Sequence, residues 1–412
     1  MKISNLEIKP STGKIDSQFV GIKIKENNIE FHYPETYDLS NDEEGLRKDI
    51  VAILRSVGLA KTFTSDKSSY NQNHKDEYAF PLKSFLWIIN DYLTYGKYEN
   101  LEKKFQEGIK GKINWKRTMS SNPAFSNGNV VYTNIISEKQ NQTDNLLTEI
   151  YFFCVQKSID SIGWLYNLKF NNNGIDYYKL FNEKKYLNTI NTELSHSFMD
   201  TKKIRLNHMK NIITGLDDSM LETNELTFGV DSYEYVFEKM IDTMFSRVDN
   251  KNEFYPNATW DLVVENNIKD SSNLRPDTIL IDKKTNNVYI IDAKYYRYGQ
   301  TFNSNHLPET TSIQKQITYG EYIKKVKVGK YNNVYNAFLM PYSKTRNVHA
   351  DMFNKDIEFV GIGSAKWIET NESNRKIAAI LIDTKFLINN WIKSSDPIVD
   401  ELITLINEKV GE

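Results

Sequence analysis

Two short apolar runs on either side of a polar stretch constrain the fold of this chain most strongly. The runs are Thr278–Ile281 and Val288–Ile291, and the six residues between them are polar. Apolar runs of strand length joined by a polar turn predict a β-hairpin. If the turn is centred near Thr285, Asp277 lies across from positions 292–293.

Three ionisable residues lie at the open end of this predicted hairpin. Asp277 precedes the first strand, and Asp292 and Lys294 end the second. Because side chains alternate along a strand, Asp292 and Lys294 share one face while Ala293 points the other way. The sequence therefore predicts that two carboxylates and an ammonium converge there.

This combination suits the hydrolysis of phosphodiester bonds. Carboxylate oxygens are ligands for Mg²⁺, which keeps several of its waters. The ion can polarise a phosphoryl oxygen and lower the pKa of a water, and the lysine can stabilise the developing charge or orient that water. The same few residues also occur at ordinary polar hairpin ends, so the surrounding elements have to be considered.

The residues around the hairpin predict an α/β domain. A helix at 232–248 comes first, and a helix at 313–325 and a terminal helix follow later. Helix, three strands, helix and strand in succession is an α/β order. The predicted strands cover 260–264, 278–281, 288–293, 334–340, 359–362 and 377–382.

The N-terminal half predicts a mixture of helices and strands, an α+β arrangement. A hairpin is expected from Phe19–Ile24 and Ile29–Tyr33, and a helix after Asn41 has an apolar stripe. Residues 64–77 are expected to form a loop. Further helices are predicted at 82–108, 143–161 and 175–196, and strands at 111–119 and 130–136.

The polar stretch 217–225 is expected to be a boundary between domains. We therefore predict one domain at 1–222 and another at 223–412.

Composition excludes several classes of protein. The 412 residues are 40% hydrophobic and 13% aromatic, which excludes a disordered chain. The longest apolar run, Ile377–Ile382, is far shorter than the roughly 20 residues of a membrane helix. One cysteine, Cys154, permits no internal disulfide, and the N-terminus lacks the apolar stretch of a signal peptide, so a cytoplasmic protein without a membrane partner is expected.

The residues Pro276-Asp277 and Asp292-Ala293-Lys294 resemble the active-site signature of the PD-(D/E)xK nuclease superfamily. This resemblance implies a restriction-endonuclease-like core with a central mixed sheet flanked by helices. It implies Mg²⁺, or Mn²⁺ in its place, bound by Asp277, Asp292 and the carbonyl of Ala293. It also suggests an accessory carboxylate, Glu238, on the preceding helix, and a glutamine–tyrosine motif at Gln316 and Tyr319.

A narrower resemblance is to the McrC-like nuclease subunits of McrBC and LlaJI-type restriction systems. Asp292–Tyr296 is similar to their Asp-Ala-Lys-Tyr ending, and Gly111–Thr118 resembles their middle region. The resemblance implies that the N-terminal half docks onto a separate, McrB-like AAA+ GTPase. The chain itself has no Gly-x-x-x-x-Gly-Lys-Ser/Thr loop for binding GTP.

Net charge neither requires nor excludes DNA as a partner. The total is −2, yet nine lysines and arginines against two glutamates lie between 294 and 346. Clusters of basic residues bind the phosphates of nucleic acids, although they also form ordinary solvated surfaces. Candidate DNA contacts are Arg297 and Lys315 here, and Lys112, Lys116 and Arg117 around Trp115, which could stack on a strand or simply charge an edge strand.

The sequence thus predicts a Mg²⁺-dependent endodeoxyribonuclease that cuts double-stranded DNA in a restriction system. Because one such site cuts one strand, a double-strand break requires two sites, from a homodimer or from assembled complexes. Three alternatives remain open. They are a stand-alone type II restriction enzyme, a repair or recombination nuclease, and a catalytically silent DNA-binding or scaffold subunit.

Overall fold

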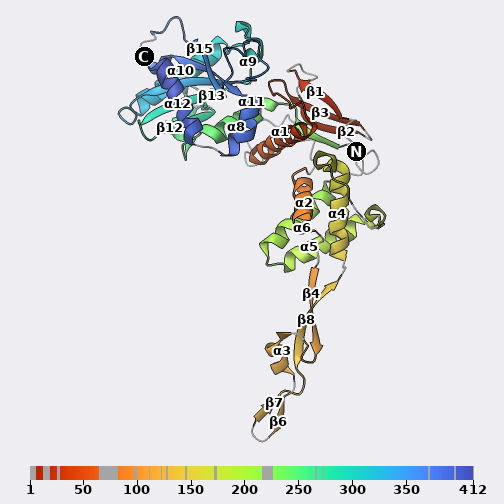
Figure 1. Cartoon of the computed structure of the whole chain (residues 1–412). Helices are drawn as coiled ribbons and strands as arrows, with labels where there is room; N and C mark the ends of the chain where they lie inside the picture. The colour runs from red at the N-terminus through yellow and green to blue at the C-terminus, as the bar shows by residue number, and fades with distance from the viewer. Residues whose placement is uncertain are drawn as a thin grey trace. The chain divides into compact units, whose positions relative to one another are not determined.

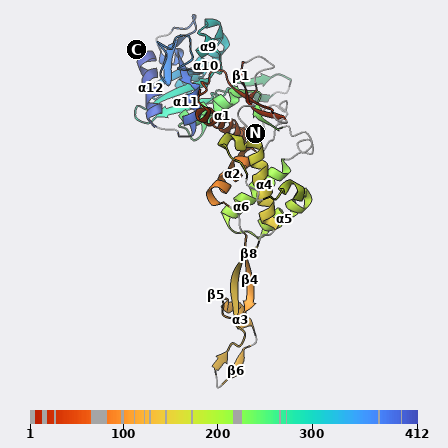
Figure 2. The ribbon, with the colours of Figure 1, turned by 45° about the vertical axis from the view of Figure 1, so that its right-hand side comes forward.

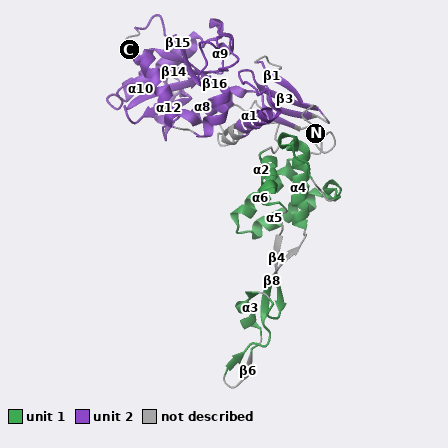
Figure 3. Cartoon of the chain, viewed as in Figure 1, with its two compact units in different colours: residues 1–5, 25–27, 79–226 green, residues 6–24, 28–78, 227–412 purple. Residues whose placement is uncertain are grey.

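The computed structural model describes most of the chain and divides it into two compact units (Figure 3). Unit 1 comprises residues 1–5, 25–27 and 79–226, and unit 2 comprises 6–24, 28–78 and 227–412. The described residues are 6–12, 19–25, 28–64, 82–96, 100–110, 112–121, 123–126, 129–143, 146–170, 174–215, 226–264, 267–271, 273–369, 372–393 and 396–411.

A mixed five-stranded sheet lies at the centre of unit 2 (Figure 1). Its order is β12-β13-β14-β16-β15. The β12–β13 and β15–β16 pairs are antiparallel, whereas β13–β14 and β14–β16 are parallel. The bounds are Thr278–Asp282 for β12, Asn287–Ala293 for β13, Val334–Tyr342 for β14, Ile377–Asp383 for β16 and Ile357–Gly363 for β15. The predicted hairpin and the mixed α/β class are confirmed.

Helices pack on this sheet and bury its apolar side chains. α8 (Tyr233–Phe245) packs on β12 and β13, α10 (Thr310–Val326) on β13 and β14, and α12 (Asp396–Val410) on β14 and β16. Every residue of β13 and β14 is buried, as expected for central strands covered on both faces. The shorter α9 (Tyr298–Thr301) and α11 (Thr384–Asn390) follow β13 and β16. β10 (Thr259–Leu262) and β11 (Asn267–Asp270) pair in a separate two-stranded sheet.

A second sheet in unit 2 is built largely from the start of the chain. Its order is β1-β3-β2-β9, from Leu6–Ser11, Asn28–Pro34, Val20–Lys25 and Leu226–Val230. Gly21 is required in β2 because a Cβ there would lie 2.1 Å from the carbonyl oxygen of Phe228. The two predicted N-terminal strands are confirmed as neighbours.

The helix predicted after Asn41 is α1 (Glu43–Thr64), and it packs on α8. Asp49 of α1 accepts hydrogen bonds from the hydroxyl of Tyr37, at 2.8 Å, and from the Lys385 ammonium of α11, at 3.0 Å. The start of the chain is therefore tied to the central sheet's domain by buried polar contacts as well as by helix packing.

Four helices form the core of unit 1. They are α2 (Leu82–Tyr95), α4 (Leu146–Ile162), α5 (Glu183–His196) and α6 (Asp200–Thr214). The helix predicted over 82–108 is too long, because α2 ends at Tyr95 and Gly96 adopts a left-handed φ of 70°. α6 was not predicted as a separate helix.

A β-rich segment continues unit 1, with β4 (Asn100–Glu107) and β8 (Ile136–Thr143) side by side in Figure 2. β5 is only Lys112–Ile113, and the helix α3 (Trp115–Ser120) follows it. The strand predicted over 111–119 is therefore wrong beyond Ile113. Asn114 explains the change, because its side chain accepts the N–H of Arg117 and caps the helix.

The shorter hairpin of unit 1 consists of β6 (Ala124–Ser126) and β7 (Asn129–Val131). The strand predicted over 130–136 is divided between β7 and β8. The predicted boundary at 217–225 and almost all of the loop predicted at 64–77 lie outside the described residues, and the domain limits 1–222 and 223–412 stay a prediction. None of the described helices is both long and apolar enough to cross a membrane.

Candidate active site

The open end of the β12–β13 hairpin brings Asp277 and Asp292 together. Thr278 pairs with Ile291, so that Asp277, one residue earlier, lies opposite Asp292. The main-chain N–H of Ala293 donates to Oδ2 of Asp277 at 2.9 Å. This bond orients the Asp277 side chain toward the end of β13, where Asp292 is almost fully buried.

Lys294 supplies the positive charge expected beside these carboxylates. Its ammonium forms an ion pair with Oδ2 of Asp292, and its main-chain N–H donates to the carbonyl of Leu339 in β14 at 2.8 Å. Burial lowers the pKa of Lys294, but the negative charges of Asp292 and Asp277 outweigh that effect and raise it above the usual value. Lys294 therefore stays protonated at neutral pH.

Glu238 of α8 joins the same cluster. Burial, and after it the charge of Asp292, raises the pKa of Glu238 to about 7, while Lys294 and Lys315 act in the opposite direction. Burial, Asp292 and Glu238 likewise raise the pKa of Asp277 well above its usual range, against the N–H of Ala293. Three carboxyl groups thus repel one another in a site of low polarity.

The carboxylates of Asp277 and Asp292 are suited to hold a divalent cation as a pair, without a third carboxylate. No group of three or more His, Cys, Asp or Glu side chains in the described part of the chain is arranged to hold a metal ion. Mg²⁺, however, is commonly held by one or two carboxylates, with waters and phosphate oxygens completing its shell. Asp277 and Asp292 fit that requirement, and a cation beside them would relieve the repulsion that raises the pKa of Asp277.

The other predicted active-site residues occupy different positions. Gln316 of α10 is fully buried, and its Nε2 donates to the carbonyl of Ile290 at 2.7 Å. It therefore braces β13 two residues before Asp292 rather than facing solvent. Ala293 is also buried, and the role of its carbonyl as a metal ligand stays a prediction.

The candidate DNA contacts fall into two groups. Lys315 lies near enough to Glu238 to lower its pKa. Arg297 donates from Nε and Nη2 to the carboxylate of Glu35, at 3.1 and 2.9 Å, which engages its guanidinium within unit 2. The remaining candidates, Lys112, Trp115, Lys116 and Arg117, belong to unit 1.

In unit 1, the Trp115 side chain is exposed, and the guanidinium of Arg117 stacks on Phe105 with 3.7 Å to the ring centroid. Both lie at or beside α3, the helix that replaces the predicted edge strand. Contact with DNA by this group stays a prediction.

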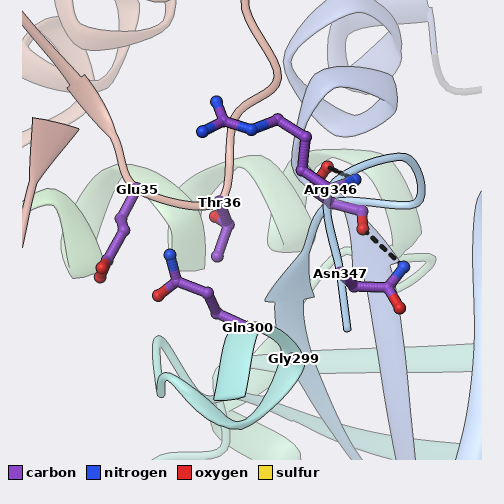
Figure 4. A pocket seen from close by; sticks show the side chains of 7 residues that line it. Glu35, Thr36, Gly299, Gln300, Arg346 and Asn347 are labelled. Atoms are coloured by element: carbon purple, nitrogen blue, oxygen red, sulfur yellow. Dashed lines mark hydrogen bonds between the residues drawn. The ribbon is translucent and has the colours of Figure 1, made fainter. Parts of the chain in front are cut away.

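A polar pocket in unit 2 lies beside the Arg297–Glu35 pair (Figure 4). The buried Oε1 of Gln300 has no hydrogen-bond partner among the described residues. The pocket shares no residue with the cluster of Asp277, Asp292 and Lys294. Its lining residues are Glu35, Thr36, Gly299, Gln300, Ser343, Arg346 and Asn347.

Two residues beside the cluster were missed by the sequence analysis. Lys251 donates to the main-chain carbonyl of Asp277 at 2.7 Å and pairs with Asp242 of α8. Lys251 and Asp277 are 26 residues apart. No local pattern connects them, so only a knowledge of the tertiary fold could have found this contact.

Comparison with known proteins identifies one family, and two of the matching solved structures are described below. The family model of the LlaJI restriction endonuclease matches residues 19–384. A refined half-complex of Thermococcus gammatolerans McrB AAA+ hexamers with bound McrC has a chain 12% identical to this one; the match covers 92% of this chain and 83% of that chain, with a TM-score of 0.43. The Thermococcus gammatolerans McrBC complex gives 14% identity, 54% and 64% coverage, and a TM-score of 0.24. A search of curated proteins found no match.

Proposed function

The chain belongs to the LlaJI restriction endonuclease family, and on that premise we propose that it is the DNA-cleaving subunit of a restriction system, hydrolysing phosphodiester bonds of double-stranded DNA with Mg²⁺. Asp277, Asp292 and Lys294 form the proposed active site. The observation that supports this assignment is their convergence at the open end of one hairpin, with the buried carboxyls repelling each other. The proposed core is of the PD-(D/E)xK type.

The proposed mechanism divides the work among these residues. When bound, Mg²⁺ or Mn²⁺ would supply Lewis-acid polarisation of a phosphoryl oxygen and acidify a water. Asp277 and Asp292 would hold the ion, and the Ala293 N–H keeps the Asp277 carboxylate oriented toward it. The Lys294 ammonium would stabilise negative charge developing on the phosphate, because it stays protonated and is held next to Asp292.

Glu238 has a separate proposed role. With a pKa raised to about 7, it can exchange a proton near neutral pH, and it would act beside the cation rather than as a third carboxylate ligand. Gln316 would hold β13 in place through the Ile290 carbonyl.

Replacement of Asp292 by Asn, and of Lys294 by Met, tests the proposal directly. Both variants should lose cleavage of double-stranded DNA in Mg²⁺, assayed with any partner and nucleotide that the wild-type protein requires. Cleavage at the wild-type rate by either variant would remove the site from consideration. A matched control is Lys202→Met, because Lys202 is also a part-buried lysine in a single ion pair, with Glu193.

We further propose that an McrB-like AAA+ GTPase activates the chain. The support is the resemblance of Asp292–Tyr296 and Gly111–Thr118 to McrC-like subunits, together with the lack of a GTP-binding loop in this sequence. Cleavage should then require the partner and GTP. Specific cleavage with Mg²⁺ alone would instead select a stand-alone type II enzyme.

The remaining alternatives give different results in the same assay. A repair or recombination nuclease should degrade DNA from ends or cut at particular structures. A silent scaffold subunit should retain its biological activity after Asp277 and Asp292 are replaced. Linear and circular substrates of the same sequence separate end-dependent from internal cleavage.

A further inference from the structure

A part-buried ion pair outside the carboxylate cluster connects the two elements that carry Glu238 and Asp277. Asp242 lies one helical turn after Glu238 on α8, and Lys251 begins the 3₁₀ turn Lys251–Phe254. The Lys251 ammonium donates to Oδ1 of Asp242 and, at 2.7 Å, to the main-chain carbonyl of Asp277. The side chains of Lys251 and Asp242 are only 22% and 20% exposed.

Further contacts fix the same junction. The hydroxyl of Thr278, the first residue of β12, lies 3.4 Å from Oδ1 of Asp242. The main-chain N–H of Arg247, just after α8, donates to the carbonyl of Ile279 at 3.1 Å. Three consecutive residues around the start of β12, Asp277, Thr278 and Ile279, are therefore hydrogen-bonded to α8 or to the residues after it. Of these bonds, the one from Lys251 to Asp277 lies nearest to the active site.

The geometry explains why this bond matters for the site. Residues four apart on a helix share a face, so that Asp242 and Glu238 lie along the same side of α8. A bond from Lys251 to the carbonyl of Asp277 sets the distance between α8 and the residue whose carboxylate faces Asp292. If that bond is lost, the junction keeps its contacts at Thr278 and Ile279, but the main chain of Asp277 loses the bond that fixes its own distance from α8.

We propose that Lys251, held by Asp242, is a positioning residue for the nuclease site and determines how tightly the Asp277–Asp292 pair binds a divalent cation. This inference rests on the proposed function. Lys251 does not itself contact the cation. It acts through the main chain of Asp277, as residues outside a metal's ligand shell do when they orient its ligands.

Binding of Mn²⁺ to the full chain without DNA, measured by isothermal titration calorimetry, tests the inference. Lys251→Met keeps the aliphatic stem but removes the donor, and it should weaken Mn²⁺ binding by about tenfold or more, the usual effect of losing such a partner. Lys251→Arg keeps a donor and a positive charge, and it should bind Mn²⁺ more tightly than Lys251→Met. Lys202→Met, a lysine of equal exposure in unit 1, should bind like the wild type.

A double variant tests whether misfolding of Lys251→Met could explain its weaker Mn²⁺ binding. Lys251→Met leaves the Asp242 carboxylate part-buried without its main partner, whereas the double variant Lys251→Met/Asp242→Leu removes both charges and is expected to fold. It should show the same weakened Mn²⁺ binding while its circular dichroism spectrum matches that of the wild type.

Wild-type Mn²⁺ affinity in a folded Lys251→Met or double variant would overturn the positioning role. So would a Lys251→Arg protein that binds no better than Lys251→Met. Asp292→Asn separates this failure from that of the proposed function. If Asp292→Asn abolishes Mn²⁺ binding and cleavage while the Lys251 variants are normal, only the positioning role fails; if Asp292→Asn binds and cleaves normally, the proposed site itself fails.

Discussion

Each compact unit contains a cluster of polar side chains around a buried aspartate, Asp91 in unit 1 and Asp292 in unit 2, and the two clusters differ in how their charges are balanced. In unit 1, Asp91 accepts two hydrogen bonds from Arg205, at 2.8 and 2.9 Å, and one from the hydroxyl of Tyr151 at 3.0 Å. One negative charge therefore meets one positive charge with good geometry. In unit 2, Asp277, Asp292 and Glu238 share a site in which Lys294 is the cation paired directly with a carboxylate.

This difference is the one expected between a structural ion pair and the proposed active site. A buried carboxylate matched by an arginine and a hydroxyl needs nothing further, so the Asp91 cluster joins α2, α4 and α6. When carboxyls outnumber the cations beside them, burial and mutual repulsion raise their pKa values, and binding a proton or a metal ion relieves the repulsion. The comparison predicts that removing a charge has opposite effects on stability in the two units.

Arg205→Met should produce the largest loss of stability. It leaves Asp91, which is 4% exposed, buried without its cation, and breaking such a pair costs about 3–5 kcal/mol. Urea unfolding followed by circular dichroism measures this loss. The control Lys202→Met removes a more exposed pair and should cost less than about 1 kcal/mol. Equal losses in the two variants would contradict the structural role of the Asp91 cluster.

Asp277→Asn should reduce cleavage without reducing the stability of the protein, unlike Arg205→Met. Cleavage should fall by about 100- to 1000-fold, equivalent to about 2.7–4 kcal/mol of transition-state stabilisation. The metal-free stability should stay the same or rise, because one of three repelling carboxyls becomes neutral while an amide oxygen can still accept the Ala293 N–H. Cleavage assays and thermal melts in EDTA measure the two effects. A strongly destabilised Asp277→Asn protein would place this cluster with the structural one.

Addition of a divalent cation should stabilise the wild-type protein. Binding to the folded state alone contributes about 2.7 kcal/mol when the metal concentration is 100 times the Kd. Thermal melts with increasing Mn²⁺ should therefore shift upward, and the shift should be lost in Asp292→Asn but kept in Arg205→Met. A shift that persists in Asp292→Asn would indicate binding elsewhere.

The pH dependence of the stability of the metal-free protein provides a fourth test. Burial and Asp292 raise the pKa of Glu238 from 4.5 to about 7, so between these pH values the folded chain holds a proton that the unfolded chain has released. Its contribution to stability is present below about pH 4.5 and is lost as the pH rises to about 7. Glu238→Gln should flatten this slope in urea titrations done in EDTA, and an unchanged slope would count against the raised pKa.

Local patterns predicted the hairpin and its end correctly. β12 and β13 lie within one residue of the predicted strands, because apolar runs of this length and the polar turn act over a few residues. The convergence of Asp277 with Asp292 follows from hairpin register alone. By contrast, a strand was predicted over 111–119, and the Asn114 cap starts a helix there instead.

Contacts between distant segments could not be predicted. Lys251 reaches Asp277 across 26 residues, and Arg297 reaches Glu35 across 262. The charge of Arg297 suggested contact with DNA, which stays a prediction, whereas its ion pair with a carboxylate from the start of the chain was not foreseen. The sequence shows that a residue is basic, but which acidic residue pairs with it depends on which segments the fold brings together.

The sequence by itself determined the mixed α/β character, the central hairpin and the three residues at its end. It did so because strand periodicity, turn composition and register are properties of neighbouring residues. Only the tertiary structure decided that residues 6–24 and 28–78 belong with 227–412 in one compact unit. It also decided that the buried Gln316 donates to the Ile290 carbonyl of β13 and that Lys251 donates to the carbonyl of Asp277. Burial and pairing depend on helix packing and sheet order, which no single segment encodes.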